Sequence, residues 1–214
     1  DWIEDARRYY TNIVGKYGPQ VQSLLRKAAA LEIEMICPLH GVVWRKDLAF
    51  AIEKYNQWSS YTPEIKSVLF VYASMYTNTE NAMNILAHKL AEKGVQNMHM
   101  YDVSKTHGSY IISDAFKYSH IVIGAPLYNN TLYLPMEALL SDMVNLNLQG
   151  RKVSLVANSS WIPNAMTPLK NSVERMKKTE IVGTPFQFKS SLKQKDEEAL
   201  SNLAEAIYAS LQEN

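Results

Sequence analysis

The feature that most constrains the fold is a regular alternation of short apolar runs and amphipathic stretches in the second part of the chain. Residues 68–72 form a continuous apolar run, which is typical of a strand covered on both faces. Residues 78–93 then carry apolar side chains at helical spacing, and Gly94 follows where a helix would end. Strict strand–helix alternation predicts an α/β fold with a parallel sheet and helices on both faces.

The same alternation continues to the end of the chain. Predicted strands cover residues 68–72, 95–103, 120–125, 153–157 and 181–188. Predicted helices cover residues 78–93, 109–118, 136–144, 165–177 and 196–211. Five strands fit a doubly wound, five-stranded sheet of order 2-1-3-4-5, in which ligands bind at the carboxyl ends of the strands, beside strands 1 and 3.

The first part of the chain has a different pattern. Helices are expected over residues 4–14, 19–31 and 46–57, and a short strand over residues 33–37. Because these elements make a poor independent domain, we expect 1–60 to be a mainly helical remnant of something larger, and 61–214 to be the sheet domain. The chain opens with Asp-Trp-Ile rather than Met, so it is expected to begin within a longer protein or after processing.

Composition excludes several classes of protein. The formal net charge is only +1, which argues against a nucleic-acid or anionic-membrane partner. No apolar run approaches the roughly 18 residues of a membrane span, and no signal peptide is recognisable. The single cysteine, Cys37, cannot form an internal disulfide, and the expected compartment is the cytoplasm.

Three loops at the carboxyl ends of the predicted strands carry the candidate binding residues. After the first strand, Ser74, Thr77, Asn78 and Thr79 gather at a helix start, where hydroxyls and free N–H groups suit a phosphate. An alternative interpretation is an ordinary capping box, with Thr77 as N-cap and Glu80 as its partner. The two interpretations have about equal support from this loop.

The loops after the third and fourth strands each place amides or hydroxyls beside an aromatic ring. They read Pro126-Leu127-Tyr128-Asn129-Asn130 and Asn158-Ser159-Ser160-Trp161. An apolar slot with a few convergent polar groups suits a planar heteroaromatic ring. No Walker loop and no G-x-G-x-x-G occurs, and the first and third strands lack the acidic ends of a response-regulator receiver.

These motifs make the chain resemble a known family. Residues 68–161 are similar to the flavodoxin-like domain of flavodiiron proteins, also called A-type flavoproteins, on the three loops just described. Residues 36–45, Ile-Cys-Pro-Leu-His-Gly-Val-Val-Trp-Arg, resemble the end of that family's metallo-β-lactamase domain. Residues 55–58 resemble the connection into the flavodoxin-like part.

The resemblance implies an FMN site and an electron-transfer function. In the family the first loop holds the phosphate and the other two hold the ring. The implied FMN-binding residues are Ser74, Met75, Tyr76, Thr77, Asn78, Thr79, Pro126, Leu127, Tyr128, Asn129, Asn130, Asn158, Ser159, Ser160 and Trp161. FMN would relay electrons from a rubredoxin or a flavin reductase to a diiron site that reduces O2 or NO. The family forms a head-to-tail homodimer. The alternative is a flavodoxin-shaped structural or interaction module that has lost tight FMN binding.

Two features depart from a complete family member. His40 matches an iron ligand of the family, but the remaining ligands belong to parts of the metal domain that these residues do not include. We therefore expect no stoichiometric iron and no reductase activity from these residues alone. The family usually carries glycine where this chain has Thr77 and Ser159. Because threonine disfavours positive φ, we expect weaker FMN binding than in the family.

Overall fold

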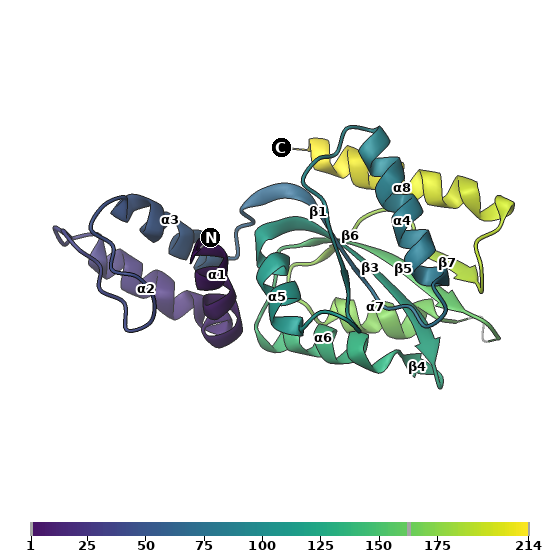
Figure 1. Ribbon diagram of the computed structural model, residues 1–214, viewed down its shortest axis with the longest axis horizontal. Helices are drawn as coiled ribbons and strands as arrows, with labels where there is room; N and C mark the ends of the chain where they lie inside the picture. Colours follow the sequence, from purple (N-terminus) through teal and green to yellow (C-terminus); the bar gives the residue numbers. More distant parts are fainter. Residues whose placement is uncertain (1, 162–163, 214) are drawn as a thin grey trace.

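The computed structural model describes residues 2–161 and 164–213. The molecule is elongated, with a group of helices at one end and a sheet covered by helices at the other (Figure 1). The first group contains α1 (Trp2–Ile13), the short helix η1 (Gly15–Tyr17), α2 (Gly18–Ala28) and α3 (Leu48–Ser60). A small cluster of Ala6, Tyr10 and Trp58 forms the interior of this group.

The sheet confirms the predicted α/β class with parallel strands, but the described residues form seven strands where five were predicted. Its strands are β1 (Ile65–Tyr72), β2 (His99–Asp102), β3 (Tyr118–Tyr128), β4 (Thr131–Leu132), β5 (Lys152–Ser159), β6 (Glu180–Ile181) and β7 (Phe186–Lys189). The main path is β2-β1-β3-β5-β6, and all of these neighbours pair in parallel. β7 also pairs with β5 in parallel, whereas β4 is antiparallel to β3.

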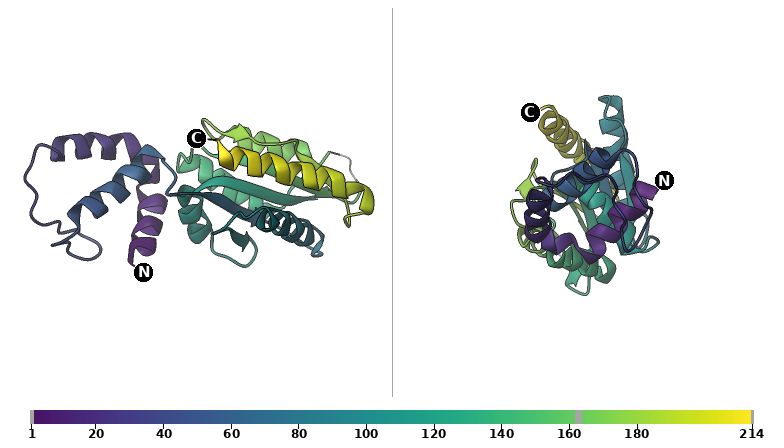
Figure 2. Two further views of the ribbon diagram at one scale, coloured as in Figure 1. Left: turned by 90° about the horizontal axis from the view of Figure 1, so that it is seen from above. Right: turned by 90° about the vertical axis from the view of Figure 1, so that its left-hand side faces the viewer.

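Helices cover both faces of the sheet (Figure 2). α4 (Asn78–Glu92) and α8 (Glu197–Gln212) cover one face, and α8 is preceded by the short helix η2 (Gln194–Asp196). α5 (Gly108–Lys117), α6 (Leu134–Asn145) and α7 (Met166–Glu174) cover the other. Because successive strand residues point to opposite faces, Phe70 packs under α4 and α8 while Leu69 and Val71 pack on the other side.

The predicted fifth strand, residues 181–188, is not continuous. It is divided into β6 and β7, which pair with different parts of β5. Gly183 lies between them at a φ of 73°, and a Cβ there would stand 2.8 Å from Leu203 of α8. Pro185 follows and has no N–H for a sheet ladder. The close approach of α8 and the missing donor together explain the break.

The prediction of a short strand over residues 33–37 is wrong. In the described part of this segment, pairing is limited to one antiparallel bridge between Ile36 and Trp44, with N···O distances of 2.9 and 2.8 Å. The loop instead packs on α1, where the rings of Trp44 and Trp2 lie 5.6 Å apart edge to face. The apolar residues of this segment indicated a strand, but the sequence alone did not show that no neighbouring strand is there to pair with it.

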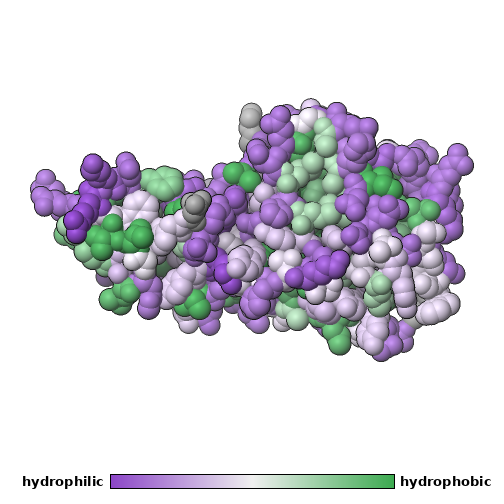
Figure 3. All heavy atoms as spheres, viewed as in Figure 1, coloured by the Kyte–Doolittle hydropathy of each residue, from purple (hydrophilic) through white to green (hydrophobic). Residues whose placement is uncertain are grey.

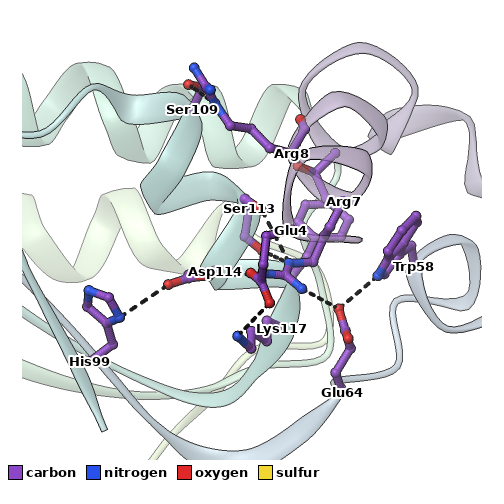
Figure 4. A network of polar contacts seen from close by, with 12 residues as sticks. Glu4, Arg7, Arg8, Trp58, Glu64, His99, Ser109, Ser113, Asp114 and Lys117 are labelled. Atoms are coloured by element: carbon purple, nitrogen blue, oxygen red, sulfur yellow. Dashed lines mark hydrogen bonds and ion pairs between the residues drawn. The ribbon is translucent and has the colours of Figure 1, made fainter. Parts of the chain in front are cut away.

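A network of buried charges fastens α1 to α5 and to the start of the sheet (Figure 4). Arg7 is 1% exposed. Its Nη1 donates to Glu64 Oε1 at 3.0 Å, its Nη2 lies 3.4 Å from Asp114 Oδ1, and it also pairs with Glu4. Its Nε donates to Ser113 at 3.2 Å. One guanidinium therefore joins the helical group to two elements of the sheet domain.

Arg151 makes a second set of buried contacts between the helical group and the sheet. Its guanidinium donates to the carbonyls of Ala115 at 2.9 Å and Phe116 at 2.8 Å, in the last turn of α5, and to that of Tyr61 at 2.7 Å. Burial lowers the pKa of Arg151. A cation at a helix carboxyl end is favoured by the helix dipole, and the carbonyls supply the acceptors that a carboxylate would otherwise provide.

His120 is buried at the amino end of β3, beneath the carboxyl end of α8. Its Nε2 lies 3.2 Å from Ser210 Oγ, and its Nδ1 lies 2.8 Å from Ser119 Oγ. Burial, followed by the nearby charges of Lys152 and Lys66, lowers the pKa of His120 from 6.5 to about 4, which the charge of Glu213 opposes. The imidazole is therefore neutral in the folded protein at neutral pH.

We expect His120 to make the protein sensitive to mild acid. Between pH 6.5 and about 4 the unfolded chain binds a proton that the folded chain excludes, so stability falls as pH falls through this window. The expected loss is about 1–2 kcal/mol after allowance for partial solvent access. Urea unfolding at several pH values should show a shallower acid limb for His120→Gln than for the unaltered chain. Parallel limbs would contradict the assignment.

Candidate functional site

A cavity of about 440 Å³ opens at the carboxyl ends of β1, β3 and β5. Its volume falls within the range of about 300–1,000 Å³ that is usual for ligand pockets. The structure brings together in its wall every predicted binding residue except Thr77, and adds Ser190. The lining residues are Ser74, Met75, Tyr76, Asn78, Thr79, Pro126, Leu127, Tyr128, Asn129, Asn130, Asn158, Ser159, Ser160, Trp161 and Ser190.

The loop between β1 and α4 carries one strained residue. Thr77 occupies the N-cap position of α4 in the left-handed region, with φ 61° and ψ −7°. Its hydroxyl donates to the Tyr76 carbonyl at 2.6 Å and does not cap the helix. The alternative interpretation of this loop as a capping box is therefore wrong. Burial, together with a hydrogen bond to the acid Glu80, raises the pKa of Tyr72. The first turn of α4 keeps its N–H groups free of a side-chain cap.

Two polar atoms in the cavity wall have no hydrogen-bond partner among the described residues. Ser74 Oγ and Asn158 Oδ1 are both buried and unpaired. Buried polar atoms in native proteins are almost always paired, so each of these atoms calls for a ligand group or an ordered water. They lie beside the start of α4, where Thr79 is 1% exposed. None of the described residues that line the cavity is a lysine or an arginine, so a phosphate there would be held by neutral donors and the helix end.

The segment between β3 and β4 is a tight hairpin, which was not predicted from the sequence. Tyr128 pairs with Thr131, and the two residues between them, Asn129 and Asn130, have φ values of 48° and 66°. Positive φ at both central positions defines the primed turn that Asn and Gly favour. The Asn pair was a usable turn signal, and the hairpin accounts for these residues without any ligand.

Aromatic side chains surround the mouth of the cavity. Trp161 is 91% exposed, Tyr76 82% and Tyr128 41%. Tyr128 also packs edge to face on Tyr133, with ring centroids 6.2 Å apart. Exposed ring faces beside a polar pocket leave apolar surface available for a planar ligand.

Ser190 is the lining residue that sequence reasoning missed. It follows β7 with a φ of 59°, and its N–H donates to the Ser159 carbonyl at 2.9 Å. The carboxyl end of the last strand also reaches the ligand edge of a doubly wound sheet, so topology could have drawn attention to this loop.

His40 lies on the helical group and not at the cavity. The segment between α2 and α3, which contains it, is at the opposite end of the molecule from β4 (Figure 1). The imidazole is exposed, and its ring centroid lies 5.4 Å from that of Tyr9. Across residues 2–161 and 164–213, no group of three or more His, Cys, Asp or Glu side chains is arranged to hold a metal ion.

Comparison with known proteins gives a consistent set of relatives. The anaerobic nitric oxide reductase flavorubredoxin of Aeromonas hydrophila is 28% identical over 207 residues, which cover 95% of this chain and 40% of that protein. The structure of rubredoxin oxygen:oxidoreductase from Desulfovibrio gigas superposes with a TM-score of 0.88 at 26% identity, covering 96% of this chain and 52% of that one.

A flavodoxin of Streptococcus pneumonia shares the fold, with a TM-score of 0.59 at 22% identity over 67% of this chain and 98% of its own. The chain spans between about a third and a half of the length of the curated relatives it matches, with values of 35%, 40% and 51%. No protein-family model matches it. Among the described helices, none has the length and apolar character needed to cross a membrane.

Proposed function

We propose that this chain, which is a relative of the flavodiiron proteins and corresponds to their flavodoxin-like C-terminal part, binds FMN in the cavity and transfers electrons. The observation that carries the proposal is the composition of one cavity wall. It combines an uncapped helix start, two unpaired buried polar atoms and exposed aromatic rings at the switch point of a doubly wound sheet.

The residues divide into a phosphate half and a ring half. Ser74, Asn78 and Thr79 would hold the phosphate through hydroxyl, amide and main-chain donors. Tyr128 and Trp161 would border the isoalloxazine ring, and both side chains are exposed. When bound, FMN supplies the ability to accept one or two electrons; the chain supplies position and polarity around it.

The phosphate-binding features of the site favour a mononucleotide over FAD or a nicotinamide dinucleotide. One uncapped helix start lines the cavity, and no dinucleotide glycine motif precedes it. Denaturing the purified protein and chromatographing the released material tests this proposal. Recovery of FMN, or saturable FMN binding by a flavin-free preparation, is the expected result. Recovery of FAD or a nicotinamide nucleotide would contradict it.

The helical group fits the proposal that residues 1–60 end a metallo-β-lactamase-like domain. Most exposed large apolar side chains among the described residues lie between residues 9 and 55, and Leu39 is 98% exposed. Figure 3 shows apolar side chains on the surface of this end of the molecule. In a longer protein such a surface would be covered by the rest of that domain.

Within such a protein, the FMN would relay electrons from a rubredoxin or a flavin reductase to a diiron site. The chain alone offers His40 as an isolated ligand of that site. A head-to-tail homodimer would bring the FMN of one subunit to the metal domain of the other. The proposed compartment is the cytoplasm, in keeping with the single cysteine.

A further inference from the structure

Asn158 connects three separate elements at the floor of the cavity. It stands near the end of β5 and is 7% exposed. Its Nδ2 donates to the Ser190 carbonyl at 3.0 Å and lies 3.4 Å from Thr79 Oγ1, in the first turn of α4. The loop after β7 is joined back to β5 by the Ser190 N–H. One amide side chain therefore joins α4, β5 and the loop after β7.

The resemblance assigned the whole loop that contains Asn158 to the ring half of the site. The contacts place its side chain at the phosphate half, because Thr79 belongs to the uncapped start of α4. The Oδ1 atom of Asn158 supports the same placement, because it is buried without a partner among the described residues of the same cavity wall. Trp161, three residues later, is almost fully exposed at the mouth of the cavity.

We infer that Asn158 is a positioning residue for the phosphate half: it fixes the first turn of α4 against β5 and the Ser190 loop. This inference rests on the proposed FMN function. The α4 donors serve a phosphate only if the helix start is held at a fixed distance from the ring half. The Asn158 side chain links that helix start to the end of β5, which leads into the loop that carries Trp161. Its effect should therefore be felt through the phosphate and not through the ring.

Comparison of FMN with riboflavin, which lacks the phosphate, separates these two effects. Fluorescence titrations of the full chain should show that Asn158→Ala raises the Kd for FMN about 5- to 30-fold, as expected for one or two lost hydrogen bonds. The Kd for riboflavin should change by less than about 2-fold. Tyr128→Ala is the matched ring-side control and should weaken both ligands by a similar factor.

Asn158→Asp provides a second variant of nearly unchanged shape. It removes the donor to the Ser190 carbonyl and adds a negative charge, which repels a phosphate much more than a neutral ring. Binding of FMN should again be weakened more than binding of riboflavin.

Equal weakening of binding for the two ligands, or no change in either Kd, would overturn the inference. If the unaltered chain binds FMN no better than riboflavin, the assignment of Ser74, Asn78 and Thr79 to the phosphate is wrong. Failure to bind either ligand would refute the proposed function and this inference with it.

Discussion

Arg7→Met should lower the free energy of unfolding by about 3–5 kcal/mol, the usual cost of removing one partner from a buried ion pair. Methionine fills a similar volume but leaves Glu64, Asp114 and Glu4 without their shared cation. Burial alone would raise the pKa of Glu64, but hydrogen bonds from Lys54 and the charge of Arg7 hold it below its usual value. Glu64 is therefore stabilising as an anion above pH 4.5, and that contribution is lost as pH falls through its folded pKa.

Tryptophan fluorescence can monitor the contact between the helical group and the sheet. Trp2, Trp44 and Trp58 belong to residues 1–60, and Trp58 Nε1 donates to Glu64 Oε1 at 2.8 Å. In urea, the Arg7→Met variant should show its fluorescence transition earlier than the far-UV transition of the sheet domain, because the helical group would detach first. Hydrogen exchange in α1 should accelerate in parallel.

Arg8→Met is the matched control on the same helix. Arg8 donates to Ser109 Oγ at 2.9 Å and its guanidinium lies 3.7 Å from the centre of the Tyr110 ring, but it contacts no carboxylate in the described structure. The Arg8→Met substitution should lower the free energy of unfolding by about 1 kcal/mol or less. Similar losses for Arg7→Met and Arg8→Met would show that the buried network does not fasten the helical group.

The sheet could be predicted because its signals are local. The apolar runs at residues 68–72, 120–125 and 153–157 lie within β1, β3 and β5, and strand–helix alternation then leaves few possible orders. The grouping of the three loops followed from the same topology, since parallel strands end at one edge of the sheet.

The features that escaped prediction depend on contacts between distant residues. Arg7 meets Asp114 and Glu64 only after the helical group has docked, and Arg151 gathers carbonyls from both parts of the chain. The break between β6 and β7 depends on the approach of α8 to Gly183. No periodicity within one segment contains this information. The Asn129-Asn130 turn is different, because its sequence signal is local and was interpreted only as a ligand contact.

Thr77→Gly should bind FMN about 5- to 150-fold more tightly than the unaltered chain. A β-branched residue held at φ 61° stores about 1–3 kcal/mol of backbone strain, and glycine adopts this conformation without it. At 1.4 kcal/mol per factor of ten, that strain corresponds to the expected gain if the empty loop relaxes out of this conformation and must return to it to receive the phosphate. Thr77 lies outside the cavity wall, and its hydroxyl is bonded to the Tyr76 carbonyl, so its removal should sacrifice no ligand contact.

Ser159→Gly is the decisive control for this prediction. The resemblance implies glycine at both positions, but Ser159 lies within β5 and its φ is not positive. Glycine there relieves no strain and removes a hydroxyl from the cavity wall, so it should not tighten FMN binding. The Thr77→Asn variant should have an FMN affinity between those of the unaltered chain and Thr77→Gly, because asparagine tolerates the left-handed region.

An FMN affinity for Thr77→Gly equal to or weaker than that of the unaltered chain would refute the strain argument. A weaker affinity would indicate that the threonine hydroxyl turns to the phosphate. A gain in unfolding free energy without a gain in affinity would show that the strain is present whether or not FMN is bound.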